Sequence, residues 1–410
     1  TTVDRTRSDL AVTILTTYKR AYDGTKLDPY PVESLKRVDR PTTFIDEERI
    51  QRVDQRAGGF ARARSGGLGP SYQNLLGLFK YPLSRAQQRM AATLADKVDG
   101  PVAEHRAPGT DDPEAMARHI KATAYFLRAD VVGICRLPPY AVYSHSQATG
   151  EPIECAHKYA IAVLVDQDWK TADASFGNDW ISTSMGFLSY STTAFISCIL
   201  ADYIRKLGYP ARAHHIRNYQ VMLPPILLWA GLGEMCRTGD IVLNPFLGTR
   251  FKAAVVTTDL PLAIDRPIDF GLQDFCSKCA KCATHCPAGA IPFGEDSTVV
   301  HNGYVKWNND VDRCLKYRIG NQWGSGCGVC IHVCPWNKPF TPFHRFVRWT
   351  MTNIPLARRL AIWGDDLMGY GTPNQKNKWW HDLEAVDGVL QTPDRSGKRF
   401  VNSPTDRASD

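Results

Sequence analysis

The sequence predicts an α+β protein that carries a separate, small, cysteine-rich module. Helical and extended patterns alternate between residues 111 and 258, and eight of the 12 cysteines lie between Cys276 and Cys334. The composition, with 43% hydrophobic and 22% charged residues, is that of an ordinary globular protein. It excludes a disordered, collagen-like or coiled-coil chain. A length of 410 residues is enough for two or three structural units.

The first region, residues 1–110, is mixed and polar. We expect it to wrap over a core rather than to form one. Its stretch from Arg56 to Pro70 is rich in glycine and arginine, which is typical of a loop.

Residues 111–268 have the clearest pattern of helices and strands. Asp112 is a candidate N-cap, and Pro113 suits the first position of the helix that follows. A longer helix is ended by Gly208, Tyr209 and Pro210, and a short one starts at Pro224 or Pro225. The long helix covers Met185–Leu207, and the strands are expected at Val131–Cys135, Tyr159–Val165, Ala211–Ile216 and Phe251–Thr258.

The module covers residues 269–340, and a C-terminal extension, residues 341–410, packs on the core. Phe343–Leu367 in that extension is aromatic and basic with helical spacing, and the last residues form a polar tail. The longest apolar stretch, Met222–Leu232, is interrupted by prolines and is shorter than the ~20 residues of a membrane span. The net charge of +7 fits a solvated surface better than a nucleic-acid groove.

The cysteines form two motifs that are typical of iron–sulfur proteins. Residues 276–287 read C-x2-C-x2-C-x3-C-P, which is the bacterial ferredoxin pattern for a cubane [4Fe–4S] cluster. Residues 327–335 read C-x2-C-x3-C-P, and Cys314 precedes them. Structural zinc also uses C-x2-C pairs, but two such runs with eight cysteines favour clusters. His285 and His332 lie beside the ligands and are expected to be neighbours rather than ligands.

In the two-cluster pattern, the last cysteine of each run binds the other cluster. Cluster one is therefore assigned to Cys276, Cys279, Cys282 and Cys334, and cluster two to Cys286, Cys314, Cys327 and Cys330. The four other cysteines lie in apolar surroundings and are expected to be small core residues. Two adjacent clusters form a path for electrons, which must end at a redox centre or at a substrate. No dinucleotide-binding fingerprint, P-loop or H-E-x-x-H motif supplies that end.

Five separated motifs resemble the corrinoid and iron–sulfur reductases, which comprise the reductive dehalogenases and the epoxyqueuosine reductases. They are YIRKLGYPARA at 203–213, AGLGEMCRTG at 230–239, TTDLPL at 257–262 and the two cysteine runs, each in the family order. The resemblance covers about residues 115–340. It implies a nitroreductase-like core that holds base-off cobalamin, with a ferredoxin-like module of two [4Fe–4S] clusters packed on it.

The resemblance favours the dehalogenase branch. Epoxyqueuosine reductases carry an aspartate proton donor shortly before the AGLG segment, whereas residues 215–220 here read HIRNYQ and contain no acid. Ser189-Tyr190-Ser191 instead resembles the proton-donor segment of the dehalogenases. The resemblance therefore implies a reductive dehalogenase that replaces carbon–halogen by carbon–hydrogen with two electrons and one proton.

Tyr190 is the predicted proton donor. Because a phenol is a weak acid, it needs a nearby cation to stabilise its phenolate. The family has a basic residue at this place, and Arg250 or Lys252 could supply it; we favour Arg250, whose charge persists when buried. Asn218 matches a family asparagine that contacts the tyrosine or the substrate. Trp323 is a weaker candidate for a wall of the substrate pocket.

Two other functions are left open. One is an epoxyqueuosine reductase, a tRNA-modifying enzyme, and the other is an electron-transfer protein without a corrinoid. The expected partners of a dehalogenase are a small halogenated substrate, a low-potential electron donor and, in respiratory members, a small membrane-anchor protein, with no nucleic acid. The chain begins at Thr1 without a leader-like segment. It is therefore expected at the outer face of the cytoplasmic membrane after leader removal, or in the cytoplasm.

Overall fold

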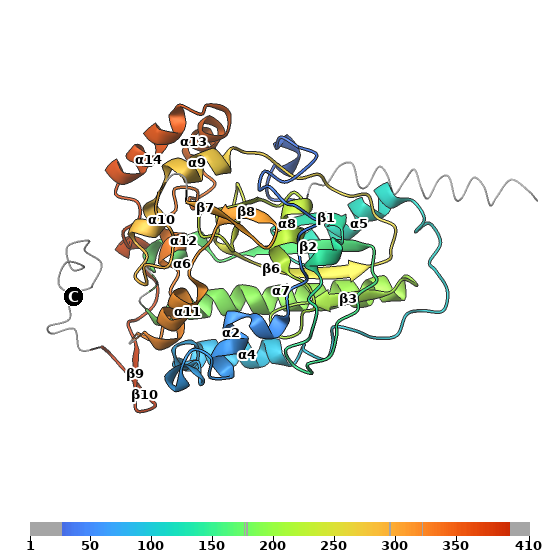
Figure 1. The fold of residues 1–410 in the computed structure, drawn as a ribbon, viewed down its shortest axis with the longest axis horizontal. Helices are drawn as coiled ribbons and strands as arrows, with labels where there is room; N and C mark the ends of the chain where they lie inside the picture. The colour runs from blue at the N-terminus through green and yellow to red at the C-terminus, as the bar shows by residue number, and fades with distance from the viewer. Residues whose placement is uncertain (1–26, 176, 178, 295–296, 322, 394–410) are drawn as a thin grey trace, which may run out of the picture.

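A four-stranded antiparallel sheet lies at the centre of the fold, between layers of helices (Figure 1). The computed structural model describes residues 27–393, apart from 176, 178, 295–296 and 322. The strands are ordered β1-β2-β6-β3. They lie where the sequence predicts extended segments: β1 (Val131–Arg136), β2 (Tyr159–Asp166), β3 (Ala211–His214) and β6 (Phe251–Thr258). β3 ends two residues early because His215 and Asn218 close a tight turn through mutual backbone hydrogen bonds.

Both faces of the sheet are buried, since side chains alternate along each strand. One face, with Leu164 and Val255, packs on α8 (Leu223–Trp229). The opposite face, with Val163 and Val256, packs on α5 (Pro113–Phe126) and α7 (Trp180–Lys206). Gly133 in β1 allows α8 to come close, because a Cβ there would lie 2.5 Å from the carbonyl oxygen of Ala230.

The helix α7 runs along the length of the sheet and is the longest element (Figure 1). It contacts β6, β3 and β2 on one side and α4 (Pro82–Ala92) on the other. It begins five residues before the predicted start at Met185. Among the described residues it is the one helix long and apolar enough to cross a membrane, but half of that segment is buried inside the protein. It is a core helix.

The first region contains helices that contact the core and the module. α2 (Gly59–Arg64) corrects the expected loop at 56–70. Its formation depends on tertiary packing, since Gly59 lies directly against Leu315 and the Arg62 guanidinium pairs with Asp312, both on α11 (Val311–Gly320). The other elements outside the sheet in residues 27–258 are η1 (Val32–Ser34), η2 (Gln55–Ala57), η3 (Pro70–Tyr72), α3 (Leu76–Phe79), η4 (Pro139–Ala141), α6 (Trp169–Ala174), β4 (Glu234–Met235) and β5 (Val242–Leu243).

The cysteine-rich module is built from short helices around one hairpin. It lies beside the N-terminal end of α7, at the left in Figure 1. Trp336 is buried between the edges of Phe270 and Phe275, with ring centroids 5.0 and 5.7 Å away. The elements are α9 (Leu272–Lys278), α10 (Lys281–Thr284), β7 (Thr298–His301), β8 (Tyr304–Trp307), α11 (Val311–Gly320) and α12 (Val329–His332).

The C-terminal extension forms two helices where the sequence predicts helical spacing, α13 (Pro342–Asn353) and α14 (Ala357–Leu367). Pro355 lies between the two helices and lacks the N–H that a continuous helix would need. Arg358 fixes α14 to α9 through an ion pair with Asp274. η5 (Gln375–Asn377) and the hairpin of β9 (Glu384–Val386) and β10 (Val389–Gln391) follow. Most of the predicted polar tail lies outside the described residues.

Candidate active site and iron–sulfur centres

The eight cysteines of the module lie close enough to influence one another. Cys276 is influenced by Cys282 and Cys334, and Cys282 by Cys334 and Cys279, while Cys236 from outside the module acts on both. Cys314 is influenced by Cys327 and Cys286, whereas Cys330 is influenced by Cys327 and Cys314 and also by Cys282. The thiols therefore gather in one region, and their division between two clusters stays a prediction.

The donor set fits two [4Fe–4S] clusters. Burial, followed by the neighbouring thiols, raises the pKa of the Cys276 and Cys282 thiols. Since only thiolates bind iron, cluster binding has to displace these protons and its energy is coupled to the folding of the module. Among the described residues, no three His, Cys, Asp or Glu side chains are arranged around the position of a single metal ion.

Arg237, which lies in the AGLGEMCRTG motif, holds the first cysteine loop in shape. Its guanidinium is 1% exposed and donates to the carbonyl oxygens of Cys276 at 2.7 Å and Cys279 at 3.0 Å. It also donates to the carbonyls of Pro292 and Gly294. No role is predicted for Arg237 from the sequence. Its place in a family motif is the one sequence feature that could have indicated this role.

The second cysteine loop rests on the start of α7. The Gly326 backbone N–H donates to the Thr183 hydroxyl at 2.5 Å, and the Ser325 hydroxyl bonds the Gly177 carbonyl. A Cβ on Gly177 would lie 3.1–3.2 Å from the backbone of Cys327 and Gly328. Cluster two is therefore placed directly against the helix that carries Tyr190.

Tyr190 and Lys252 lie together on neighbouring elements. Tyr190 is seven residues after Thr183, which puts it on the same face of α7 and ~10 Å further along. The ammonium Nζ of Lys252, from β6, lies 5.1 Å from the centre of the Tyr190 ring. This is a cation–π contact, and a positive charge at this place stabilises a phenolate. Lys252 is therefore the cation that the predicted proton donor requires.

Arg250 has a different task, which corrects our preference for it. It lies one residue before β6 begins, and its guanidinium is 2% exposed. Nε donates to Asp166 Oδ1 at 2.8 Å, a second nitrogen donates to Oδ2 at 3.1 Å, and a third bonds Asn337. Since Asn337 follows Cys334 by three residues, Arg250 connects the sheet to the cluster module.

Asn218 has both of its polar side-chain atoms bonded within the fold. Its side chain accepts a hydrogen bond from Arg212 at 2.9 Å and donates one to the Ala95 carbonyl at 2.7 Å. Both polar atoms thus stabilise the turn after β3; among the described residues neither bonds Tyr190, and a contact with the substrate stays a prediction. Its neighbour Tyr219 is closer to the site: burial, followed by the charge of Tyr190, raises the pKa of Tyr219, while Arg64 lowers it.

Trp323 is half-buried, and its backbone carbonyl accepts a hydrogen bond from the Tyr81 hydroxyl at 3.0 Å. Its proposed place in a pocket wall stays a prediction. Of the cysteines outside the module, Cys135, Cys198 and Cys236 are buried as expected. Cys155 is not: it is half-buried, and its sulfur lies 3.9 Å from Nδ1 of His157.

Polar groups without partners lie on α7, which carries Tyr190, and just after β2. Gln167 Oε1 and Ser184 Oγ are buried and make no hydrogen bond within the described residues. Gln167 is close to Lys252, because a Cβ on Gly186 would lie 3.4 Å from Gln167 Nε2 and 3.6 Å from Lys252 Cε. Buried polar groups are rarely left unpaired. This region is therefore suited to a bound group with many hydrogen-bonding substituents.

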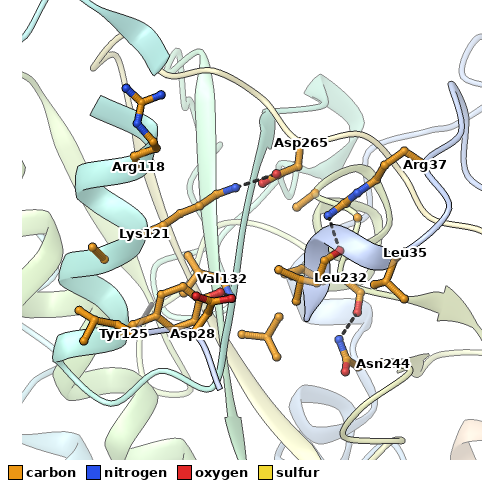
Figure 2. A pocket seen from close by; sticks show the side chains of 16 residues that line it. Asp28, Leu35, Arg37, Arg118, Lys121, Tyr125, Val132, Leu232, Asn244 and Asp265 are labelled. Atoms are coloured by element: carbon orange, nitrogen blue, oxygen red, sulfur yellow. Dashed lines mark hydrogen bonds and ion pairs between the residues drawn. The ribbon is translucent and has the colours of Figure 1, made fainter. Parts of the chain in front are cut away.

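A separate cavity of about 460 Å³ lies between α5 and the first region (Figure 2). Lys121 and Asp265, which line it, form an ion pair at 2.7 Å. Asp265 also accepts from the Ile134 backbone, so its charge is used within the fold. None of the predicted site residues lines this cavity.

Comparison with known proteins agrees with the geometry. Residues 275–337 match the family described as a 4Fe-4S double cluster binding domain, which confirms the two predicted clusters. The tetrachloroethene reductive dehalogenase of Sulfurospirillum multivorans is 30% identical over 323 residues, which cover 70% of this chain and 62% of that protein. The enzyme of the same name from Dehalobacter restrictus is 37% identical over 251 residues, 56% of this chain and 44% of that protein.

A solved structure extends the likeness over almost all of the chain. The catabolic reductive dehalogenase NpRdhA, in complex with 3-bromo-4-hydroxybenzoic acid, is 40% identical with a TM-score of 0.88, and covers 93% of this chain. The chain is thus similar to reductive dehalogenases in sequence and in structure. The predicted fold class is thereby confirmed. This dehalogenase relative spans 55% of the NpRdhA chain and less than two thirds of the curated relatives named above.

Proposed function

We propose that the chain carries the catalytic centre of a cobalamin-dependent reductive dehalogenase. The observation that carries the proposal is the contact between Lys252 of β6 and Tyr190 of α7, the helix that also contacts the cluster-two loop. Electrons and a proton can thus be delivered to one region. The likeness to dehalogenases of known structure supports this proposal.

The cofactors of this proposal are two [4Fe–4S] clusters and a base-off cobalamin. A second solved relative, whose structure suggests a mechanism for B12-dependent dehalogenation, is 40% identical with a TM-score of 0.88. The unpartnered Gln167 and Ser184 atoms supply hydrogen-bonding groups that would fit the amide-rich rim of a corrin ring. When bound, the corrinoid supplies a metal centre that accepts electrons and passes them to the carbon–halogen bond.

The overall reaction consumes two electrons and one proton, and it releases one halide ion for each carbon–hydrogen bond formed. The Tyr190 hydroxyl donates the proton to the carbon that loses the halogen. Lys252, beside the ring, stabilises the phenolate that this step leaves behind. The substrate class is a small halogenated organic molecule. A low-potential electron donor is required, whereas the outer-face location and the membrane-anchor protein stay predictions.

The test is Tyr190→Phe in protein that is purified without oxygen and loaded with both clusters and cobalamin. We expect halide release, with a chemical reductant and excess organohalide, to fall by about 10²-fold or more, because the proton donor is removed. The matched control is Tyr203→Phe, which is further along α7. Unchanged halide release by Tyr190→Phe would refute the proton-donor role. Purified protein that fails to retain cobalamin would refute the proposed cobalamin-dependent activity.

A further inference from the structure

A second cavity, of about 770 Å³, lies between α13 and the segments at Pro31–Leu35 and Pro245–Phe246. We name it the Arg348 cavity. Two arginines, Arg345 and Arg348, line it, and no aspartate or glutamate among the described residues does so. The cavity therefore carries a positive charge that its lining does not neutralise.

Arg348 is the unusual residue of this cavity. Its side chain is 7% exposed, and one nitrogen donates to the carbonyls of Lys338 at 2.7 Å and Phe246 at 3.2 Å. Nε and the other terminal nitrogen are buried without a partner among the described residues. Buried charges are normally paired with an opposite charge. Burial, followed by the charge of Arg250, lowers the pKa of Arg348 to about 10.

Other donors and flat surfaces surround this charge. The indole N–H of Trp336, which is 1% exposed, also lacks a partner within the described part of the chain. Phe340 lies under both guanidinium groups, at 5.3 Å from Arg345 and 5.4 Å from Arg348. Phe246 packs edge-on against Phe340. The exposed rings of Phe346 and Trp349 form the rim.

We propose that the Arg348 cavity binds a small organic anion that carries a flat aromatic ring. The unpartnered donors at its base have no acceptor, so they select an anionic group. The aromatic walls favour a ring that can stack or pack edge-on. A volume of about 770 Å³ is in the usual range for a small-molecule site. The proposal goes beyond the dehalogenase activity, and it rests on the proposed function only where the ligand is part of the cofactor.

Two sources could supply this chemistry. One is a free aromatic carboxylate, sulfonate or phenolate. The other is the tail of a bound base-off cobalamin, which combines a phosphodiester with an aromatic base. The two sources differ in one measurable respect, because only the tail would occupy the cavity permanently in cobalamin-loaded protein.

The test is a titration with naphthalene-2-sulfonate, followed by calorimetry, on protein that holds both clusters, with and without cobalamin. The uncharged 2-naphthalenemethanol and inorganic sulfate serve as matched ligands. We expect the sulfonate to bind about tenfold or more tightly than either. Binding only to cobalamin-free protein identifies the tail as the natural occupant, and equal binding to both forms identifies a free ligand.

Arg348→Gln should abolish the preference for the sulfonate over the alcohol. Because Arg348 also bonds two backbone carbonyls, Arg345→Gln is the second variant, and it should weaken the preference without a structural risk. Arg359→Gln, on the exposed side of α14 and outside the cavity, is the control and should bind as the natural protein does. Equal affinity for the sulfonate and the alcohol, or full binding by both cavity variants, would overturn the proposal. Sulfate that binds as tightly as the sulfonate would show an ion site without an aromatic requirement, which also overturns it.

Discussion

Lys252 and Arg250 are two residues apart but have very different surroundings. Arg250 is held by Asp166 and Asn337, so its charge is already neutralised within the fold. Lys252 has the face of the Tyr190 ring as its contact. A cation without a carboxylate partner is free to respond when the tyrosine becomes an anion. For this reason the lysine, and not the arginine, suits a step in which charge develops.

We therefore expect Lys252→Gln to slow halide release by about 10–100-fold, with little change in KM, because the phenolate loses its stabilising charge. Lys252→Arg should recover part of the rate. The measurement is steady-state halide release with its solvent deuterium isotope effect, which should rise in Lys252→Gln as proton transfer becomes limiting. Lys170→Gln, an exposed lysine on α6, is the control. A normal rate in Lys252→Gln would exclude this role.

At the scale of elements, the sheet and the cluster module are joined through Arg250. The pair with Asp166 is at the end of β2, and Asn337 in turn donates to the Ile331 carbonyl at 2.9 Å. One guanidinium thus joins β2, the start of β6 and the segment after the second cysteine run. Removal of this group leaves a partly buried carboxylate without its counter-ion.

Arg250→Met should lower the free energy of unfolding by roughly 3 kcal/mol, which is typical of a broken buried ion pair. Folded protein should still release halide within a few-fold of the normal rate, because the arginine does not contact Tyr190. Denaturant unfolding and halide release on the same sample test both parts. Arg313→Met removes an exposed ion pair and should cost less than about 1 kcal/mol. An Arg250→Met variant that is stable but inactive would contradict this structural role and support Arg250 as the catalytic cation.

The start of α7 is sensitive to pH. Burial is the main cause that raises the pKa of Asp179 from 3.8 to about 6, although its hydrogen bond with Ser175 opposes the shift. The folded state thus holds this proton more tightly than the unfolded state, and the stability it contributes is lost as the pH rises through about 6. From pH 5 to pH 7 this loss is about 1 kcal/mol.

Asp179→Asn should remove that loss. We compare the Tm of the variant with that of the natural protein at each pH. The difference, variant minus natural protein, should be larger at pH 7 than at pH 5, by a few degrees at most. Anaerobic thermal unfolding at three pH values measures the difference, and Asp168→Asn, an exposed aspartate nearby, controls for surface charge. A difference in Tm that does not change with pH would contradict the assigned burial.

At the scale of the whole molecule, the predicted crossing of Cys286 and Cys334 would join the two halves of the module. Cys286→Ser should remove cluster two, although its sequence neighbours bind cluster one. Cys334→Ser should remove cluster one. Each variant should contain about half of the iron of the natural protein, and the remaining electron paramagnetic resonance signal should differ between them. Cys198→Ser, a buried cysteine outside the module, should keep all the iron. Loss of the same signal in both cluster variants would disprove the crossing.

The sequence predicts features that depend on neighbouring residues better than features that depend on residues far apart in the chain. The sheet strands and α5 depend on local patterns of β-branched residues and a capping aspartate, so their positions were predicted closely. α2 was missed because its glycine- and arginine-rich segment is helical only through contacts with α11. The choice between Arg250 and Lys252 could not be made either. It depends on Asp166 and Asn337, which are 84 and 87 residues away in the chain.

The helix α7 contacts the cluster-two loop at Thr183 and presents Tyr190 two turns later. A rigid helix of this kind fixes both the spacing and the angular phase between the cluster-two loop and the predicted proton donor. One residue inserted between these positions would rotate the phenol by about 100° and turn it away from Lys252. The spacing of seven residues between Thr183 and Tyr190 is therefore itself required, and no side-chain substitution can compensate for a change in it.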